Sequence, residues 1–407
     1  MGKRDEIIVG LDIGTTKVCC VVGQITDHGI DIIGLGNQRA KGLRKGVVIN
    51  IDSTVQSIRR AVEEAETMAA CEIHSVYASI AGANIQGTDS DGKVAIKSRE
   101  VDAEDVARVL EQARAIPMGN DREIIHMLPR EFIIDDQDGI SEPIGMSGVG
   151  LKAQVYVVTA PQAYIQNIMK SAERCNLDIE EVVLGQMASA EAVLEDDEKE
   201  LGVAVVDIGG GTTDIVVYYK GAVIHTGVIP VGGNNVTNDI AVGLRTPMAE
   251  AEKIKLNHGC ALSALVSPED TIEVPSVGGR SPRILSRSVL SEIVEPRVEE
   301  LFGLVKNALV RAGVFDKINS GIVITGGACM MEGMTDAAEE VTGLPVRLGI
   351  PKPVGGLYDL LDGPRFATAV GLVLYGSRKM RGQLKKNNEA VVTTAGGKFR
   401  QWLREVF

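Results

Sequence analysis

One pattern occurs twice in this chain, and it limits the folds that the chain can adopt. Near the N-terminus an apolar stretch ends in Asp12-Ile-Gly-Thr-Thr-Lys17, and the second half of the chain repeats the design as Asp207-Ile-Gly-Gly-Gly-Thr-Thr-Asp214. In each copy the residues before the aspartate read as a buried strand, and those after the Gly-Thr turn read as the second strand of a hairpin. The repeat therefore predicts a duplicated architecture with two lobes.

Both turns carry groups that bind a phosphate chain. Such a site needs backbone amides in a tight turn, hydroxyl donors and a balancing cation. The two turns supply these groups from Gly14, Thr15, Thr16 and Lys17 in the first copy and from Gly209, Gly210, Gly211, Thr212 and Thr213 in the second. The pair therefore predicts a phosphate clamp formed by two facing turns.

The carboxylates of the two motifs predict a metal. Asp12 and Asp207 are suited to hold a hydrated Mg²⁺, with Asp214 as a further candidate near the metal and the attacking water. A glycine-containing β-hairpin without a ligand is the alternative for either motif alone, but the occurrence of two favours the clamp. Neither copy matches the P-loop pattern GxxxxGK[ST] or the dinucleotide pattern GxGxxG.

Together with Ile322-Val-Ile-Thr-Gly326-Gly327, the two hairpins resemble the phosphate and adenosine motifs of the superfamily of actin, heat-shock chaperones and sugar kinases. The resemblance implies an α/β fold with two RNase H-like lobes and ATP bound between them. It also implies that Gly326, Gly327 and Met330 face the adenine. Glu252 and Lys255 would reach the ribose and base, with a solvated helix face as their alternative.

Within that superfamily, the chain resembles the FtsA family of bacterial division proteins over nearly its whole length. The similar features are the opening motif, Val274-Pro-Ser-Val-Gly-Gly followed by Ile293-Val-Glu-Pro-Arg297, an insertion at 84–163 and a basic tail. Actin and MreB carry a subdomain where this chain has only residues 34–50. The FtsA family lacks that subdomain and has a small one elsewhere, which fits the insertion.

This resemblance implies an actin-like protein that polymerises and tethers the tubulin-like GTPase FtsZ to the cytoplasmic face of the inner membrane at the division septum. Residues 226–304 would bind the C-terminal peptide of FtsZ, with Arg297 and Glu300 as candidates and a solvated helix face as the alternative. Later division proteins would bind the inserted subdomain. A phosphotransferase or a pilus-assembly ATPase of the same superfamily is the alternative function.

Hydrolysis is expected to be weak at most. The catalytic candidates are Gln186, which matches the residue that positions water in hydrolysing relatives, and Asp207. A hydrogen bond at the start of its helix is the alternative role for Gln186. Small residues at Ala188, Ala192, Ala367 and Gly371 predict two helices that cross closely between the lobes.

Alternation of strands and helices predicts α/β lobes with largely parallel pairing. Ser53 is the expected N-cap of a helix that runs to Ala70, and the acidic run 195–200 reads as a solvated junction. The predicted organisation is a lobe 1 core of 1–83 with 164–197 and 358–379, the inserted subdomain 84–163, a lobe 2 core of 198–225 with 305–357, an outer subdomain 226–304, a flexible linker 380–397 and an amphipathic helix 398–407.

The tail differs from the rest of the chain in charge. The net charge of −13 disfavours broad binding to nucleic acid, yet residues 378–407 hold eight basic and two acidic residues. The sequence predicts a terminal helix in the membrane interface, with Phe399, Trp402, Leu403, Val406 and Phe407 on one face and Lys398, Arg400 and Arg404 around it. A terminal helix docked on its own domain is the alternative.

Other composition features exclude several classes. The six cysteines and five histidines show no zinc-type spacing, so a metal site built from them is not expected. The N-terminus lacks the apolar stretch of a signal peptide, which favours a reducing cytosol. No apolar run approaches the ~20 residues of a membrane span.

Overall fold

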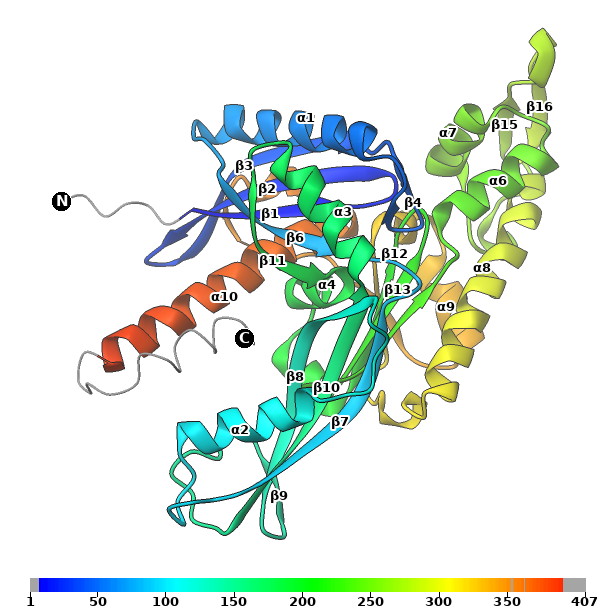
Figure 1. The fold of residues 1–407 in the computed structure, drawn as a ribbon. Helices are drawn as coiled ribbons and strands as arrows, with labels where there is room; N and C mark the ends of the chain where they lie inside the picture. Colours follow the sequence, from blue (N-terminus) through cyan, green and yellow to red (C-terminus); the bar gives the residue numbers. More distant parts are fainter. Residues whose placement is uncertain (1–6, 353, 362, 391–407) are drawn as a thin grey trace.

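The computed structural model describes residues 7–352, 354–361 and 363–390. Two α/β lobes lie beside each other, and an elongated subdomain projects from one end (Figure 1). Among the described residues, no helix is long and apolar enough to cross a membrane. The predicted α/β class and the two lobes are confirmed.

Lobe 1 is built on a six-stranded sheet. Its strand order is β11 (Asp178–Leu184), β6 (Ser75–Ile80), β1 (Ile7–Ile13), β2 (Lys17–Thr26), β3 (Gly29–Arg39) and β19 (Gly355–Gly356). The successive strands β1, β2 and β3 pair antiparallel, whereas β6 is parallel to both β1 and β11. β19 is also parallel to β3, so three of the five strand pairings in this sheet are parallel and two are antiparallel. The two antiparallel pairings depart from the prediction, because short hairpin turns can join only antiparallel neighbours.

Helices cover both faces of this sheet. Helix α1 (Ile51–Ala69) packs on β3, and α10 (Ala367–Ala390) packs on β1 from the other side (Figure 1). Asn50, not the predicted Ser53, is the N-cap of α1, and its side chain accepts a hydrogen bond from the Ser53 amide at 2.9 Å. The helix starts earlier than predicted because Asn50 already has the extended backbone of a cap.

Lobe 2 repeats this design. Its strand order is β14 (Ala222–Ile229), β13 (Thr213–Tyr219), β12 (Val203–Ile208), β17 (Ile322–Thr325) and β18 (Val346–Leu348). Here too the first three strands pair antiparallel, whereas β17 is parallel to β12 and β18 is parallel to β17. The surrounding elements are α6 (Gly233–Gly243), α7 (Met248–His258), β15 (Thr271–Val274), β16 (Arg283–Ser286), α8 (Arg287–Arg311) and α9 (Met334–Thr342).

The insertion forms a separate sheet with its own core. Its strand order is β7 (Gln86–Ala95), β10 (Gly150–Pro161), β8 (Arg122–Ile134) and β9 (Gln137–Ile140), and α2 (Ala103–Arg114) packs on β7 and β10. This subdomain also contacts lobe 2. Arg130 donates to the Val223 and Ile224 carbonyls at 3.1 and 2.6 Å, and the Tyr156 hydroxyl accepts from the Thr226 amide at 2.8 Å. These bonds cap the free edge of β14.

Two helices cross between the lobes, as predicted from their small residues. They are α4 (Gly185–Val193) and α10, and a side chain at Gly371 would overlap the Ala188 carbonyl oxygen. Only glycine allows the two backbones to approach this closely. The crossing holds α4 and the start of α10 beside the end of β12, which sets the floor of the site described below.

The acidic run joins α4 to the first strand of lobe 2, and Glu195, Asp196, Asp197 and Glu200 are exposed, as a solvated junction requires. Residues Asp196–Leu201 form a short helix, α5, and Glu195 forms a salt bridge with Lys352 at 3.0 Å. Glu198 accepts two hydrogen bonds from Arg347, at 2.7 and 2.6 Å. The helix and these two pairings were not predicted, because the cations come from a distant part of the sequence.

The predicted linker also differs from the structure. Helix α10 continues through Ala390, so residues 380–390 are helical. One glycine, Gly382, is outnumbered there by residues of higher helix propensity, and an existing helix extends more easily than a new one forms. Residues 391–397 of the linker and the predicted amphipathic helix 398–407 lie outside the described residues.

Candidate functional site

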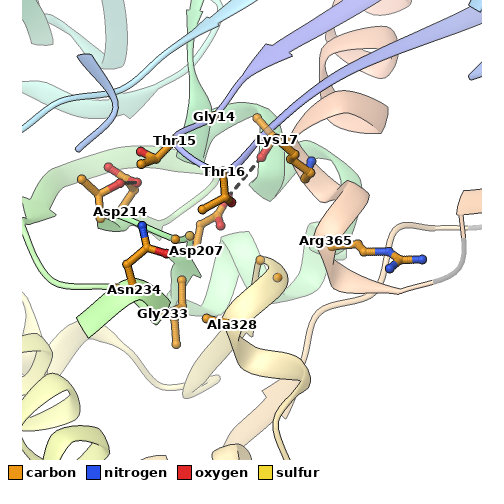
Figure 2. A pocket seen from close by; sticks show the side chains of 18 of the residues that line it. Gly14, Thr15, Thr16, Lys17, Asp207, Asp214, Gly233, Asn234, Ala328 and Arg365 are labelled. Carbon is orange, nitrogen blue, oxygen red and sulfur yellow. Dashed lines mark hydrogen bonds between the residues drawn. The ribbon is translucent and has the colours of Figure 1, made fainter. Parts of the chain in front are cut away.

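A cavity of ≈ 410 Å³ lies between the lobes, and both Asp-Gly-Thr turns line it (Figure 2). This volume is within the range of small-molecule sites. The predicted residues that line the cavity are Asp12, Gly14, Thr15, Thr16, Lys17, Gln186, Asp207, Gly209, Gly210, Thr212, Asp214, Glu252, Lys255, Gly326, Gly327 and Met330. Two predicted residues, Gly211 and Thr213, are not among them. Thr213 is fully buried and donates to the Val231 carbonyl, and Gly211 lies against Thr15 of the first turn.

The first turn contains its own counter-ion. The Gly14 amide donates to the Lys17 carbonyl at 3.0 Å, which closes the turn, and the Lys17 ammonium lies 3.0 Å from Asp12 Oδ2. Ser79, at the end of the neighbouring strand β6, donates to Asp12 Oδ1 at 3.0 Å. Burial alone would lower the pKa of Lys17, but the charges of Asp12 and Asp207 raise it above its ordinary value. Lys17 is therefore a permanent cation in the cavity wall.

The second turn has the same backbone but lacks a cation. The Gly209 amide donates to the Thr212 carbonyl at 2.9 Å. Asp207 forms no salt bridge among the described residues, and burial raises its pKa. Burial, with a contribution from Asp207, raises the pKa of Asp214 to about 7. The nearby cation, Lys17, is already paired with Asp12, so this side of the cavity favours a further cation.

The two turns touch each other across the cavity. A side chain at Gly210 would overlap the methyl group of Thr16, and one at Gly211 would meet Thr15 at 2.9 Å. Thr15 also accepts a hydrogen bond at 2.9 Å from the Gly46 amide, at the turn between β4 (Leu43–Arg44) and β5 (Val47–Val48). Glycines in the second turn therefore let the phosphate-binding backbones of the two lobes meet.

The opposite end of the cavity is formed by lobe 2. Gly326 and Met330 lie in the turn after β17, and Lys255 of α7 points toward α6. The Lys255 ammonium lies 2.8 Å from the Glu252 carboxylate and donates to the Thr237 hydroxyl at 2.9 Å. The Lys255 side chain is only 11% exposed, so the solvated helix face is the wrong description of this residue.

Polar atoms without partners show where a ligand fits. Gln186 is 1% exposed, and neither its amide oxygen nor its amide nitrogen has a hydrogen-bond partner in the described structure. The predicted alternative, a hydrogen bond at the start of its helix, is therefore not seen. One carboxylate oxygen of Asp214 is also buried without a partner. Buried polar groups are almost always paired, so both side chains fit a site that a polar ligand or its water completes.

The site suits a nucleotide with Mg²⁺. Turn amides, hydroxyls and Lys17 provide the donors for a phosphate chain, and the carboxylates of Asp12 and Asp207 are hard oxygen donors of the type that Mg²⁺ prefers. Among the described residues there is no group of three or more His, Cys, Asp or Glu side chains that could hold a metal directly.

Sequence reasoning missed several residues of the site. Ser79 contacts Asp12, and Ser189 and Thr368 contact Asp207. Ser189 and Thr368 lie within the small-residue patterns of the crossing helices, which were interpreted only as packing. Each pattern contains one residue with a hydroxyl group, and that group was the signal that could have identified a site residue.

Predicted residues of other sites do not belong to the cavity. Arg297 of α8 forms a salt bridge with Asp239 of α6 at 2.6 Å and pairs with Glu300. These contacts are internal to lobe 2, so the description as a solvated helix face is incomplete. All the predicted membrane residues lie outside the described residues.

Comparison with known protein families gives two matches. Residues 204–371 match the family described as "Cell division protein FtsA", and residues 82–159 match "SHS2 domain inserted in FTSA". The cell division protein FtsA of Pseudomonas aeruginosa PAO1 is 52% identical over 93% of this chain and 91% of its own length. That of Escherichia coli K12 is 41% identical over 99% and 98% of the two chains.

Solved structures show the same fold. The type IV pilus biogenesis complex PilM–PilN matches with a TM-score of 0.65 at 17% identity, covering 91% of this chain and 98% of that one. MreB5 of Spiroplasma citri bound to ADP matches with a TM-score of 0.55 at 14% identity, covering 94% and 98%. At these identities the likeness shows the fold alone, and it confirms the predicted actin-like architecture. The match to the inserted domain confirms the inserted subdomain.

Proposed function

Because this chain belongs to the FtsA family of cell division proteins, we propose that it binds ATP with Mg²⁺ between its lobes and acts as a filament-forming adaptor at the division septum. The observation that carries the proposal is the pair of Asp-Gly-Thr turns facing each other across one cavity. The two turns complement each other. The first contains a lysine, and the second contains the carboxylates of Asp207 and Asp214, which form no salt bridge among the described residues.

The residues of the cavity divide the work of binding. Lys17 and the amides of both turns would hold the outer phosphates, and Gly326, Gly327 and Met330 would face the adenine. When bound, hydrated Mg²⁺ neutralises phosphate charge, and Asp12 and Asp207 would hold it through water. The unpartnered amide of Gln186 would orient a water molecule, which supports at most a weak ATPase.

The adaptor role rests on three further surfaces. Residues 398–407 would lie in the inner face of the cell membrane, where apolar burial and cations near anionic lipid combine. Residues 226–304 would bind the C-terminal peptide of FtsZ, and the inserted subdomain would bind later division proteins. A filament presents many terminal helices at once and gains avidity without new contacts.

The nucleotide part is tested by thermal unfolding. A ligand that binds only the folded chain stabilises it by about 2.7 kcal/mol at 100 times its dissociation constant. ATP with Mg²⁺ should therefore raise the melting temperature of the full chain, and inorganic phosphate at equal concentration serves as the control. An unchanged melting temperature with both ATP and GTP would contradict the site.

The membrane part is tested by cosedimentation with liposomes that contain anionic lipid. Wild-type protein should sediment more strongly with ATP than without it, and Trp402→Glu should release it while Trp402→Phe should not. Added salt should weaken binding, because part of it is electrostatic. Full binding after deletion of residues 397–407 would exclude the terminal segment as the anchor.

A further inference from the structure

The carboxylate of Asp207 is held by hydroxyl groups that come from the other lobe. Asp207 is the second-last residue of strand β12 in lobe 2, whereas Ser189 lies on α4 and Thr368 on the first turn of α10. Ser189 Oγ lies 2.5 Å from Asp207 Oδ2, and Thr368 Oγ1 lies 3.2 Å from the same oxygen. The two hydroxyls are 3.0 Å apart. The three side chains therefore form one hydrogen-bonded triangle across the lobe boundary.

Two hydroxyl protons serve the three contacts of this triangle, so two of the contacts are hydrogen bonds at any one time, and Ser189 Oγ also lies 3.1 Å from the Gly185 carbonyl oxygen. Each hydroxyl has one proton to donate and can accept from another. Ser189 is fully buried, and its distance to Asp207 is that of a hydroxyl bound to an ionised carboxylate. Thr368 can donate either to Asp207 or to Ser189. In both arrangements the carboxylate accepts at Oδ2 only.

The second oxygen of Asp207 is confined on its other side. A side chain at Gly326 would overlap Asp207 Oδ1, so the glycine after β17 leaves just enough space for this oxygen. With Oδ2 bound and Oδ1 lying over Gly326, the carboxylate has one orientation. Asp12, its counterpart in lobe 1, is instead held by a cation.

We propose that Ser189 and Thr368 are positioning residues, which fix the Asp207 carboxylate so that it can receive the hydrated Mg²⁺ of a bound nucleotide. The inference rests on the proposed function and deepens it. It also gives the crossing helices a role besides packing, because in the close approach at Gly371 and Ala188, Gly371 lies about one turn after Thr368 and Ala188 directly precedes Ser189.

The test is ATP affinity of the full chain, measured with excess Mg²⁺ and again with a chelator. In the wild-type protein Mg²⁺ should strengthen ATP binding. Thr368→Val and Ser189→Ala should each reduce the Mg²⁺-dependent gain in ATP affinity by about tenfold, the size expected for a hydrogen bond to a charged group. The ATP affinity measured with chelator should stay unchanged. Thr368→Ser keeps the hydroxyl and should behave as wild type.

Ser377→Ala is the matched control, since Ser377 is a buried hydroxyl on the same helix without a contact to Asp207. Equal loss of affinity with and without Mg²⁺ would show a merely structural role and overturn the inference, as would unchanged affinity in both variants. If Thr368→Val does not fold, Ser189→Ala and Thr368→Ser decide the question. Failure of the wild-type protein to bind ATP would instead overturn the proposed function itself.

Discussion

The two Asp-Gly-Thr turns share a backbone but differ in how their aspartates are balanced. In lobe 1, Asp12 is paired with Lys17 at 3.0 Å inside the same turn. In lobe 2, the hydroxyls of Ser189 and Thr368 hold Asp207, which forms no salt bridge within the described part of the chain. Each turn is closed by one amide-to-carbonyl hydrogen bond at almost the same distance, 3.0 and 2.9 Å.

The difference shows how a duplicated motif can acquire two roles. The backbone hydrogen bonds keep the shape of the turn, so the side chains around it are free to change. The turn that contains its own cation suits a phosphate, and the turn whose carboxylates have no cation within the turn suits a metal ion. The predictions below test this division, from the largest expected effect to the smallest.

Removal of the lysine should have the largest effect. Lys17→Met keeps the length of the side chain but leaves Asp12 unpaired in the cavity wall. Lys17 would form a charge pair with the phosphate, and loss of one partner of a buried charge pair across a binding interface costs about 2–5 kcal/mol, so ATP affinity measured by calorimetry should fall by about 100-fold. Lys253→Met, at an exposed position of α7, is the control. Equal ATP affinity in both variants would show that the first turn does not bind phosphate.

Contact between the turns should be the next most sensitive feature. Gly210→Ala would force a methyl group against the methyl group of Thr16, and overpacking of this kind costs about 1–3 kcal/mol. The melting temperature should fall, and Thr16→Ser in the same chain should restore part of it by removing the opposing methyl. No recovery in the double variant would mean that the turns do not touch in solution.

Asp214 should make stability depend on pH. Its pKa is about 7 in the folded protein against 3.8 for an ordinary aspartate, so the folded state favours the neutral acid. That stabilisation is complete below about pH 4 and is lost as the pH rises through about 7. Without nucleotide, Asp214→Asn should therefore be more stable than wild type at pH 8, by about 1.4 kcal/mol for each unit by which the pKa is raised, and equally stable at pH 4.

The control for this effect is Asp197→Asn, an exposed carboxyl on α5. Its unfolding free energy should follow that of the wild-type protein at every pH. If Asp214→Asn did so too, Asp214 would be ionised in the folded protein at neutral pH.

The smallest effect should come from Ser79. Ser79→Ala removes a donor from Asp12, but the salt bridge with Lys17 remains. A hydrogen bond to a charged group contributes about 1.5–3 kcal/mol to stability, but Lys17 still holds the Asp12 carboxylate, so ATP affinity should change by less than about fivefold. A larger loss than in Thr368→Val would reverse the comparison between the two aspartates.

Features carried by adjacent residues were predictable from the sequence. Both hairpins, the insertion and the small-residue crossing are local patterns, and the structure contains all of them. Contacts between distant residues were not predictable. The pairing of Glu198 with Arg347 and of Asp207 with Thr368 depends on chain segments that meet only in the folded protein. Ser189 stands between two alanines, and nothing in that stretch of sequence shows that it contacts Asp207.

The central claim is that ATP and Mg²⁺ bind between the two turns, and calorimetric titration of the full chain with ATP tests it most directly. We predict one ATP bound per chain, weaker binding when Mg²⁺ is removed, and a loss of about 100-fold in Lys17→Met. Binding of neither ATP nor GTP in the presence of Mg²⁺, or ATP binding that is equally strong in Lys17→Met, would contradict it.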